Sequence, residues 1–328
     1  MFLNDPYVEP QDAPPTPRGR YAPSPTGPLH LGNLRTALVC WMHMRLLNGA
    51  LILRIEDLDE ERVVPECTQK LMDDLLWLGL EWDEGPRVGG PHASYMQSQR
   101  LEHYARATEA LEAQGVLYKC LCSRKEIRQV QSAPHGRTHV YPGTCRDLTP
   151  QEYQEQASLK DGRAPVLRVR VGDRVIAFED GIYGPQTQDL AAEVGDFIVM
   201  RRDGFFAYQL AVVVDDALMS ITHVLRGEDL LESTPRQLLL YEYLNQPAPT
   251  FFHVPLMQDN QGIKLSKRDG ASSLDTYRDS GWSADRVIGH LAYSLNLVDR
   301  DEPISPQELV DSLSLEAFVR TLQNSEPA

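Results

Sequence analysis

The sequence predicts an α/β protein built on a parallel sheet, because strand-like and helix-like segments alternate near the start of the chain. Segments at residues 19–22, 34–47, 50–55 and 66–78 follow one another in the order strand, helix, strand, helix. The strand segments are extended or apolar, and the last segment has helical periodicity. Parallel strands need crossovers of this kind between them. We therefore expect a parallel sheet with helices on its faces.

A second α/β region lies much later in the chain. We expect strands at residues 196–200, 206–214, 221–225 and 251–254, and a helix at residues 235–243. In open parallel sheets, ligands bind at the carboxyl ends of the strands, where two such halves meet. The loop after the first strand, Glu56 and the loop after the last strand should all reach that edge.

A long segment separates the two halves, and helical patterns follow them at residues 284–295 and 306–323. We therefore predict a tail, a first half of the sheet domain, an insertion, a second half and a short helical C-terminal piece. Their boundaries are residues 1–17, 18–82, 83–194, 195–268 and 269–328. The length of 328 residues suits one domain with a large insertion, or two domains.

The composition is that of an ordinary globular protein with an acidic balance. Hydrophobic residues make up 42% of the chain, and its formal net charge is −15. That charge excludes indiscriminate binding of nucleic acid, but not an RNA partner held by a local basic face. The basic residues of the candidate face are Arg124, Lys125, Arg128, His135, Arg137, His139 and Arg146.

The N-terminus differs from a targeting signal. Residues 1–17 hold three acidic residues and five prolines but no lysine or arginine, so we expect a disordered tail. No apolar run approaches the length of a membrane span. The five cysteines are an odd number and suggest no disulfide framework. We expect a cytoplasmic protein without membrane contact.

Two segments far apart in the sequence indicate a nucleotide site. The first reads PSPTGPLHLGN at residues 23–33, between a predicted strand and a predicted helix. Its prolines and glycines, Gly32 among them, hold the backbone in a turn, and Asn33 is placed to cap the helix. The free N–H groups of the helix start favour a phosphate, and His30 adds a side-chain donor.

The second segment follows the last predicted strand and reads KLSKR at residues 264–268. Lys264 and Lys267 offer ammonium groups, Ser266 a hydroxyl and Arg268 a guanidinium, a set suited to a polyphosphate. The chain has neither a Gly-x4-Gly-Lys-Ser/Thr loop nor a Gly-x-Gly-x-x-Gly pattern. The two segments together predict a nucleotide site closed by a cationic loop.

The joint pattern resembles the two signature motifs of class I aminoacyl-tRNA synthetases, and of the glutamyl subgroup in particular. The resemblance covers nearly all of residues 18–268, including LRIED at 53–57, QSQR at 97–100 and AVVVDD at 211–216. It implies a Rossmann-type catalytic domain split by a connective insertion, which uses ATP with Mg²⁺. The catalytic residues that it implies are His30, Lys264 and Lys267, and the further ATP contacts are Gly32, Asn33 and Ser266.

The chain departs from the family pattern at two positions. Asn33 stands where the broader class has a second histidine, and Arg268 replaces the usual final serine of the lysine loop. The first change removes one donor to the phosphates, which leaves His30 and backbone amides to hold them. The second change adds a charge and should not impair ATP binding.

An enzyme that activates an acidic amino acid must balance a carboxylate and an ammonium in one pocket. Arginine suits the carboxylate, and glutamate or aspartate suits the ammonium. Arg20 and Glu56 end predicted strands, and Tyr208 lies in a later one. The glutamate contacts that the resemblance implies are Arg20, Ala22, Ser24, Glu56, Tyr208 and Arg226.

Three cysteines of the insertion suggest a metal site. Cys120 and Cys122 can point the same way from an extended segment, and Cys145 follows after a loop. A structural zinc needs four ligands, whereas Cys40 and Cys67 fall in predicted helices as core residues. The candidates that the residues alone leave for the fourth ligand are Tyr141, His135, His139 and water.

The spacing Cys-x-Cys and then Tyr-x3-Cys resembles the zinc site of glutamyl-Q tRNA(Asp) synthetases, which are short paralogues of glutamyl-tRNA synthetase. The resemblance implies one structural Zn²⁺ held by Cys120, Cys122, Tyr141 and Cys145. It also implies transfer of glutamate to queuosine in the anticodon of tRNA(Asp). The chain ends soon after the lysine loop, where a full glutamyl-tRNA synthetase continues into an anticodon-binding region.

Three other functions stay open at the level of the sequence. The first is a minimal glutamyl-tRNA synthetase that charges the 3′ end of tRNA(Glu). The second is a non-catalytic zinc RNA-binding protein with a synthetase fold, although such a protein would not need His30 or the loop lysines. The third is an ATP-dependent ligase that joins glutamate to a small amine, which would need neither tRNA nor a basic face.

Overall fold

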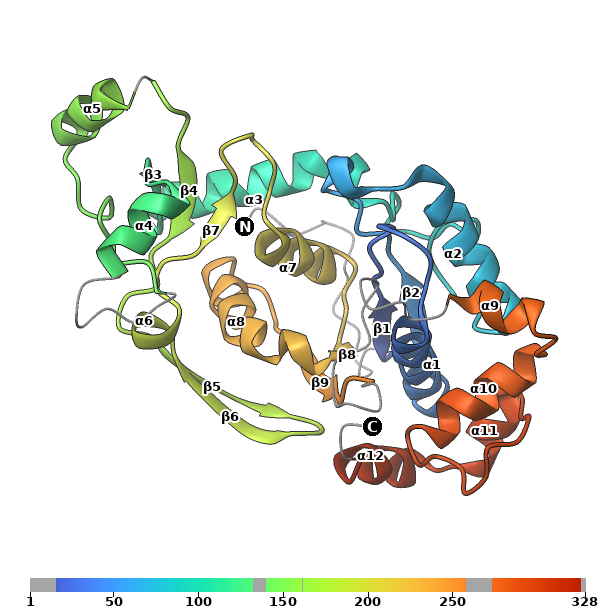
Figure 1. The fold of residues 1–328 in the computed structure, drawn as a ribbon. Helices are drawn as coiled ribbons and strands as arrows, with labels where there is room; N and C mark the ends of the chain where they lie inside the picture. The colour runs from blue at the N-terminus through green and yellow to red at the C-terminus, as the bar shows by residue number, and fades with distance from the viewer. Residues whose placement is uncertain (1–15, 132–139, 161, 258–272, 326–328) are drawn as a thin grey trace.

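The structure, a computed structural model, describes residues 16–131, 140–160, 162–257 and 273–325. Its centre is a six-stranded sheet in the order β2-β1-β8-β9-β5-β6 (Figure 1). Neighbouring strands are parallel except for β6, which pairs antiparallel with β5. The strands are β1 (Arg18–Tyr21), β2 (Ala50–Leu53), β5 (Val175–Asp180), β6 (Gly184–Asp189), β8 (His223–Gly227) and β9 (Thr250–Val254). The predicted α/β fold with a parallel sheet is confirmed.

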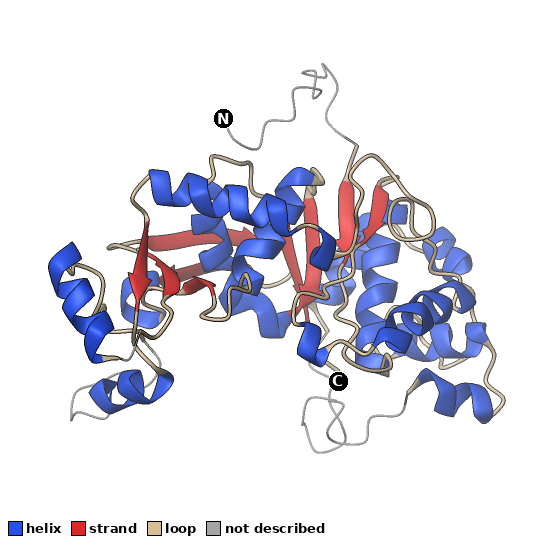
Figure 2. Ribbon diagram, turned by 90° about the horizontal axis from the view of Figure 1, so that it is seen from above, coloured by secondary structure: helices blue, strands red, loops and turns tan. Residues whose placement is uncertain are grey.

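Helices cover both faces of this sheet (Figure 2). Alternate residues of a strand point to opposite faces, and β2 shows the result: Leu51 and Leu53 belong to one hydrophobic core, Ile52 to the other. The first core includes α1 (Leu31–Leu46), α2 (Pro65–Trp77), α10 (Ala284–Tyr293), α11 (Pro306–Ser312) and α12 (Leu315–Gln323). The second core includes α3 (Leu101–Ala113), α7 (Tyr208–Leu218) and α8 (Thr234–Tyr243).

Most predicted elements of the two halves are present within a few residues of the expected bounds. The order β1, α1, β2, α2 matches the prediction, as do β8, α8 and β9 in the second half. The predicted strand at residues 206–214 is wrong, because this stretch lies in α7. Its apolar run from Ala211 to Val214 is fully buried in a helix that packs on α3 and α8, and a short apolar run does not by itself distinguish a buried helix from a strand.

The predicted helix at residues 306–323 is two helices. Leu313 has extended backbone angles, φ −125° and ψ 141°, which end α11. Ser314 then caps α12 by accepting a hydrogen bond from the N–H of Ala317. Both helices pack on the same core, in which Leu309 of α11 and Phe318 and Leu322 of α12 are buried. The C-terminal piece also contains α9 (Leu274–Asp279).

The segment between the halves forms a separate three-stranded antiparallel sheet and several helices at one end of the molecule (Figure 1). Two strands of this sheet are β3 (Leu117–Cys120) and β4 (Val166–Val169). The third is β7 (Ile198–Met200), so the strand expected at residues 196–200 in the second half of the main sheet pairs instead with β4. The helices are α4 (Arg124–Gln131), α5 (Pro150–Leu159) and α6 (Leu190–Glu193). The β5–β6 hairpin extends from this end along the edge of the main sheet, where Asp180 pairs with Phe251. No helix in the described ranges is long and apolar enough to cross a membrane.

His43 is a buried polar residue in the core beneath α1. Its side chain packs edge-on against the rings of Phe252 and His223, at centroid distances of 4.6 and 5.6 Å, and its Nδ1 atom has no hydrogen-bond partner. Burial, together with the neighbouring His223, lowers the pKa of His43 to about 4. The folded protein therefore holds this ring neutral.

This burial predicts a loss of stability in acid. An unfolded histidine has a pKa of about 6.5, so the unfolded chain takes up a proton between pH 6.5 and pH 4 that folded His43 does not. Stability is thus lost as the pH falls through that window. Between pH 7 and pH 5, the free energy of unfolding should fall by about 2 kcal/mol more in the wild type than in His43→Leu, as measured by urea denaturation. Parallel pH profiles for the two proteins would contradict this account.

Candidate active site

A cleft of about 460 Å³ opens at the carboxyl ends of β1, β2, β8 and β9. It is lined by nine of the residues singled out from the sequence, which are Arg20, Ala22, Ser24, His30, Gly32, Asn33, Glu56, Tyr208 and Arg226. Tyr208 reaches it from the first position of α7 rather than from a strand. Lys264, Ser266 and Lys267 lie outside the described residues. The cleft is at the edge of the sheet where ligands of parallel α/β proteins bind.

The first sequence motif connects β1 to α1 along this cleft. His30, not Asn33, is the N-cap of α1: its Nδ1 accepts the N–H of Asn33 at 3.3 Å, while Asn33 Oδ1 accepts the N–H of His30 at 3.4 Å. The helix therefore starts earlier than predicted, because this reciprocal capping pair satisfies its first donors. Gly32 lets the His30 ring lie close to the backbone, since a Cβ at position 32 would lie 3.1 Å from that ring. The positive end of the α1 dipole faces the cleft.

Arg35, two residues after the motif in α1, links this helix to the chain that follows β9. It is buried, and its guanidinium donates to the carbonyl oxygens of Pro255 at 2.6 Å and Ser294 at 3.5 Å. Burial lowers the pKa of Arg35 to about 10, so the group keeps its charge at neutral pH. These bonds hold the backbone directly after β9 against α1. Residues 264–268 follow that backbone in the sequence.

The base of the cleft is a buried network of charges. Asp216 Oδ1 accepts hydrogen bonds from Arg20 Nε at 3.3 Å and from Arg54 Nη1 at 2.7 Å. Its neighbour Asp215 accepts from Arg100 Nε at 2.6 Å and from Gln97 and Tyr104, each at 2.8 Å. Arg54 Nε lies 3.6 Å from Asp215 Oδ2. Both aspartates follow the apolar run of α7 and are almost fully buried. Buried ions need such paired, hydrogen-bonded partners.

Glu56 stands above this network and faces the cleft. Its backbone N–H donates to the Pro23 carbonyl at 3.0 Å, and its carboxylate lies 3.6 Å from the Arg54 guanidinium. Burial raises the pKa of Glu56 to about 7, because the attraction of Arg54 and Arg20 is opposed by Asp216 and Asp215. The carboxyl group therefore changes its charge near neutral pH and would be held ionised by a bound cation.

Arg226 enters the cleft from the end of β8, and its guanidinium is buried. Its partners are His253 Nε2 at 2.9 Å, Gln237 Oε1 at 2.8 Å, Thr234 Oγ1 at 2.9 Å and the Leu230 carbonyl at 3.3 Å. Burial lowers the pKa of Arg226. Arg20 shares its charge with Asp216, whereas the partners of Arg226 within the described chain are neutral acceptors. Arg226 is thus prepared for an anionic ligand.

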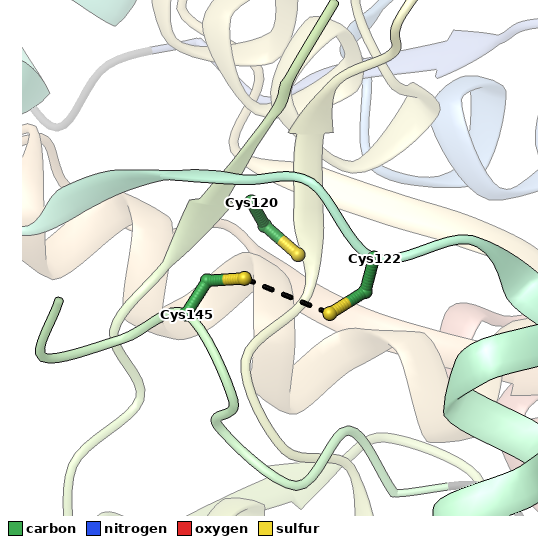
Figure 3. A group of neighbouring side chains, drawn as sticks. All are labelled: Cys120, Cys122 and Cys145. Carbon is green, nitrogen blue, oxygen red and sulfur yellow. Dashed lines mark hydrogen bonds between the residues drawn. The ribbon is translucent and has the colours of Figure 1, made fainter. Parts of the chain in front are cut away.

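The three cysteines of the middle segment meet at a second site (Figure 3). Their sulfur atoms lie within 4.8 Å of one another, and the Cys122 and Cys145 sulfurs are 3.6 Å apart. A tetrahedral zinc with bonds of about 2.3 Å separates its sulfur ligands by about 3.8 Å, so the cluster fits a metal. Hydrogen bonds from Cys122 and Cys145 lower the pKa of Cys120, which favours the first thiolate at that residue.

Tyr141 completes the surroundings of this cluster. Its Oη lies 3.2 Å from Cys120 Sγ and 3.8 Å from Cys122 Sγ, and it accepts the N–H of Cys145 at 3.0 Å. Burial raises the pKa of Tyr141, while the Arg168 guanidinium stacks 3.8 Å from its ring centre. His135 and His139 lie outside the described residues. Cys40 and Cys67 are buried in α1 and α2, as predicted for core residues.

Comparison with known proteins identifies the family of the chain. Residues 17–318 match the model of tRNA synthetases class I (E and Q), catalytic domain. The chain belongs to this family. It is 53% identical to a glutamyl-Q tRNA(Asp) synthetase of Symbiobacterium thermophilum, over 92% of this chain and 94% of the relative. It is 45% identical to a glutamate–tRNA ligase of the same organism, over 84% of this chain and 58% of the relative.

The solved structures agree with this family. The fold is similar to the crystal structure of a glutamate tRNA ligase from Elizabethkingia meningosepticum in complex with its amino acid, with a TM-score of 0.81 and 32% identity. The match covers 96% of this chain and 67% of that ligase. The class I synthetase fold expected from the two sequence motifs is therefore confirmed. The chain is a ligase-type enzyme of a class that uses ATP with Mg²⁺.

Several residues of this synthetase site were not singled out from the sequence. Asp215, Asp216 and Arg54 lie in segments that resemble the family, yet nothing in their spacing shows that they meet beneath Arg20. Two charged residues directly after an apolar run of four are a signal that could have drawn attention to Asp215 and Asp216. His253 had no such signal, because a lone histidine in a strand is usually a core residue.

The basic residues between Arg124 and Arg146 are only partly available to a ligand. Arg146 is committed to Asp196 at 2.6 Å, whereas Arg124 and Lys125 are exposed at the start of α4. The side chain of Arg128 and residues 132–139 are not described.

Proposed function

We propose that this synthetase activates L-glutamate with ATP and transfers it to queuosine in the anticodon of tRNA(Asp). The observation that carries the first half of this proposal is the cleft itself. It combines a helix N-terminus suited to phosphates with buried cationic and anionic side chains suited to an acidic amino acid. The second half is supported by the relative of that name, which is 53% identical to this chain over 94% of its own length.

The amino-acid end of the cleft has partners for two of the charges of glutamate, its α-ammonium and its side-chain carboxylate. The Glu56 carboxylate suits the α-ammonium. Arg226 suits the side-chain carboxylate through its buried positive charge and the second N–H of Nη1, since its other N–H groups donate to protein acceptors. Arg20 and Tyr208 lie between them, and Ala22 and Ser24 form the wall on the β1 side. A neutral glutamine amide would leave Arg226 without an anionic partner, so the pocket favours glutamate.

The phosphate end uses the first motif. His30, Gly32 and Asn33 line the phosphate end, where the positive end of the α1 dipole faces the cleft and favours the triphosphate. Lys264, Ser266 and Lys267 would add two ammonium groups and a hydroxyl. Mg²⁺ that enters with ATP neutralises phosphate charge. An oxygen of the glutamate α-carboxylate attacks the α-phosphorus, and the bond to the bridging oxygen breaks as pyrophosphate leaves. Catalysis is then positioning and charge stabilisation without a protein nucleophile.

The second step forms an ester on the acceptor. A hydroxyl oxygen of the tRNA attacks the carbonyl carbon of glutamyl-adenylate, the hydroxyl proton is released, and AMP leaves. An unpaired anticodon-loop nucleotide can enter such a cleft directly, as single-stranded RNA commonly does in its protein sites. Arg124 and Lys125 are exposed cations that would contact the phosphates of that loop.

A second candidate is the charging of the 3′ end of tRNA(Glu). It is favoured by the identity to glutamate–tRNA ligases and by the fold shared with a solved one. We rank it second because, within Symbiobacterium thermophilum, identity is higher to the glutamyl-Q tRNA(Asp) synthetase than to the glutamate–tRNA ligase, at 53% against 45%.

The acceptor is tested by glutamylation of three tRNA pools with labelled glutamate. We expect labelling of tRNA(Asp) from queuosine-containing cells and none of tRNA(Asp) from queuosine-deficient cells or of tRNA(Glu). The label should survive removal of the 3′ adenosine. Label that is lost with that adenosine, or equal labelling of both tRNA(Asp) pools, would establish the second candidate instead.

We also propose that the cysteine cluster holds one structural Zn²⁺ through Cys120, Cys122, Cys145 and the Tyr141 phenolate. The support is the fit of the sulfur distances to a tetrahedral ion and the position of Tyr141 Oη beside two of the sulfurs. A bound dication supplies the charge that makes deprotonation of a buried phenol favourable. The Arg168 guanidinium over the ring adds to the same effect.

Metal analysis of the purified protein checks this site. About one zinc per chain is expected in the wild type, and loss of zinc in Cys122→Ser and Tyr141→Phe. Cys67→Ser is the matched control, since Cys67 is also buried but lies in α2 outside the cluster, and it should retain full zinc. Full zinc in Tyr141→Phe together with loss in a His135 or His139 variant would assign the fourth ligand to histidine.

Glutamate binding should depend on pH through Glu56. Because the pKa of Glu56 is raised to about 7, its carboxylate is present above pH 7 and is progressively protonated below it. Only the carboxylate attracts the substrate ammonium, which stays charged throughout this range. The KM for glutamate in ATP–pyrophosphate exchange should therefore rise about tenfold per pH unit below pH 7. Glu56→Gln should bind glutamate weakly at every pH, and an equally steep profile in that variant would assign the dependence to another group.

A further inference from the structure

Arg226 is connected to a buried carboxylate that lies outside the cleft. Asp180, the last residue of β5, places its Oδ2 2.6 Å from Nδ1 of His253, and His253 places its Nε2 2.9 Å from Nε of Arg226. The side chains of Asp180 and His253 are both completely buried. The three side chains form a continuous line from the β5–β6 hairpin through β9 to the cleft end of β8.

The partners fix the protonation of this line. Asp180 Oδ1 accepts the backbone N–H groups of Ile182 and Tyr183, each at 3.0 Å, and of His253 at 3.2 Å. Although burial opposes ionisation, these bonds and the His253 ring hold the pKa of Asp180 below its usual range. An ionised Asp180 must receive the Nδ1 proton of His253. The Nε2 atom of His253 is then a lone-pair acceptor for the Arg226 N–H.

The surroundings keep His253 neutral. The Arg226 guanidinium lies directly against the ring and Arg20 lies farther off, so two cations oppose protonation, and Asp180 is the facing anion. Burial is the largest cause that lowers the pKa of His253. Arg226 is therefore oriented by a neutral acceptor. Because that acceptor carries no negative charge, it does not neutralise the positive charge of Arg226 at the cleft.

We propose that Asp180 and His253 are positioning residues for the substrate side-chain carboxylate, acting through Arg226. This inference rests on the proposed activation of glutamate, because it assigns Arg226 to the side chain of that substrate. Thr234 and Gln237 orient the other nitrogens of Arg226 from α8. Of these three partners, only His253 can lose its acceptor through a change of ring tautomer. The orientation of Arg226 therefore depends on which ring nitrogen of His253 carries the proton. Asp180, which lies outside the cleft, fixes that proton on Nδ1.

The substitution Asp180→Asn isolates this effect. The amide has the shape of the carboxylate, and its oxygen still accepts the three backbone N–H groups at Oδ1. Its NH₂ group then occupies the Oδ2 position and donates to Nδ1, so the ring proton moves to Nε2 and faces the Arg226 N–H. We expect the KM for glutamate to rise about 10- to 100-fold, with the KM for ATP unchanged.

A second pair of variants separates orientation from packing. In His253→Gln alone, the amide NH₂ can donate to the Asp180 carboxylate while the amide oxygen accepts the Arg226 N–H, so glutamate binding should be kept. In Asp180→Asn with His253→Gln, the amide stands between two donors and has one acceptor, so binding should stay as weak as in Asp180→Asn alone. A purely structural role for the pair predicts that His253→Gln alone also weakens binding. Asp301→Asn is the matched control, since Asp301 also faces a histidine ring, His290 at 3.0 Å, away from the cleft.

Two readouts decide the proposal. An unchanged KM for glutamate in Asp180→Asn, or a loss of glutamate binding in His253→Gln alone, overturns it. Nitrogen NMR of the His253 ring gives an answer that does not depend on activity: Nε2 should be unprotonated in the wild type and protonated in Asp180→Asn, and a protonated Nε2 in the wild type overturns the assignment. A wild type that shows this tautomer but no glutamate-dependent exchange would instead refute the proposed function.

Discussion

The adjacent aspartates Asp215 and Asp216 are the interaction on which the rest of the site depends. They end the apolar part of α7 and together bind three arginines that come from β1, from the end of β2 and from the start of α3. Each of these charges would be very costly to bury alone. The network therefore fixes how both halves of the parallel sheet and the helix α3 meet, and it does so directly beneath the cleft.

The same network determines which charges remain for a ligand. Arg20 and Arg54 are largely compensated by Asp216, while Glu56 lies close enough to two further carboxylates that its pKa rises to about 7. Arg226 stands apart, with neutral partners. The cleft thus has an anionic end and a cationic end whose strengths are set by residues outside the cleft. This division suits a zwitterionic amino acid with an acidic side chain.

The middle segment contributes to the protein in two ways. Its antiparallel sheet carries the cysteine cluster at the far end of the molecule, where Tyr141 and the three sulfurs lie at distances suited to a metal. Its β5–β6 hairpin joins the edge of the main sheet, and Asp180 there reaches the line of side chains behind Arg226. A segment that interrupts the two halves in sequence is therefore also a support for the pocket that they form.

The sequence by itself determined the parallel α/β fold, the position of the cleft and nine of its lining residues. Strand ends, glycine turns and a helix start are local features that short-range chemistry specifies. The sequence analysis was wrong about residues 206–214, because an apolar run does not reveal whether it packs as a strand or as a buried helix. It was also wrong about the cap of α1, because His30 and Asn33 are both residues whose side chains can accept a backbone N–H there. Only the tertiary structure decided that Asp216 lies under Arg20 and that Asp180 stands behind His253. These contacts join residues far apart in the chain, and their stability comes from burial of charges that no local pattern of the sequence records.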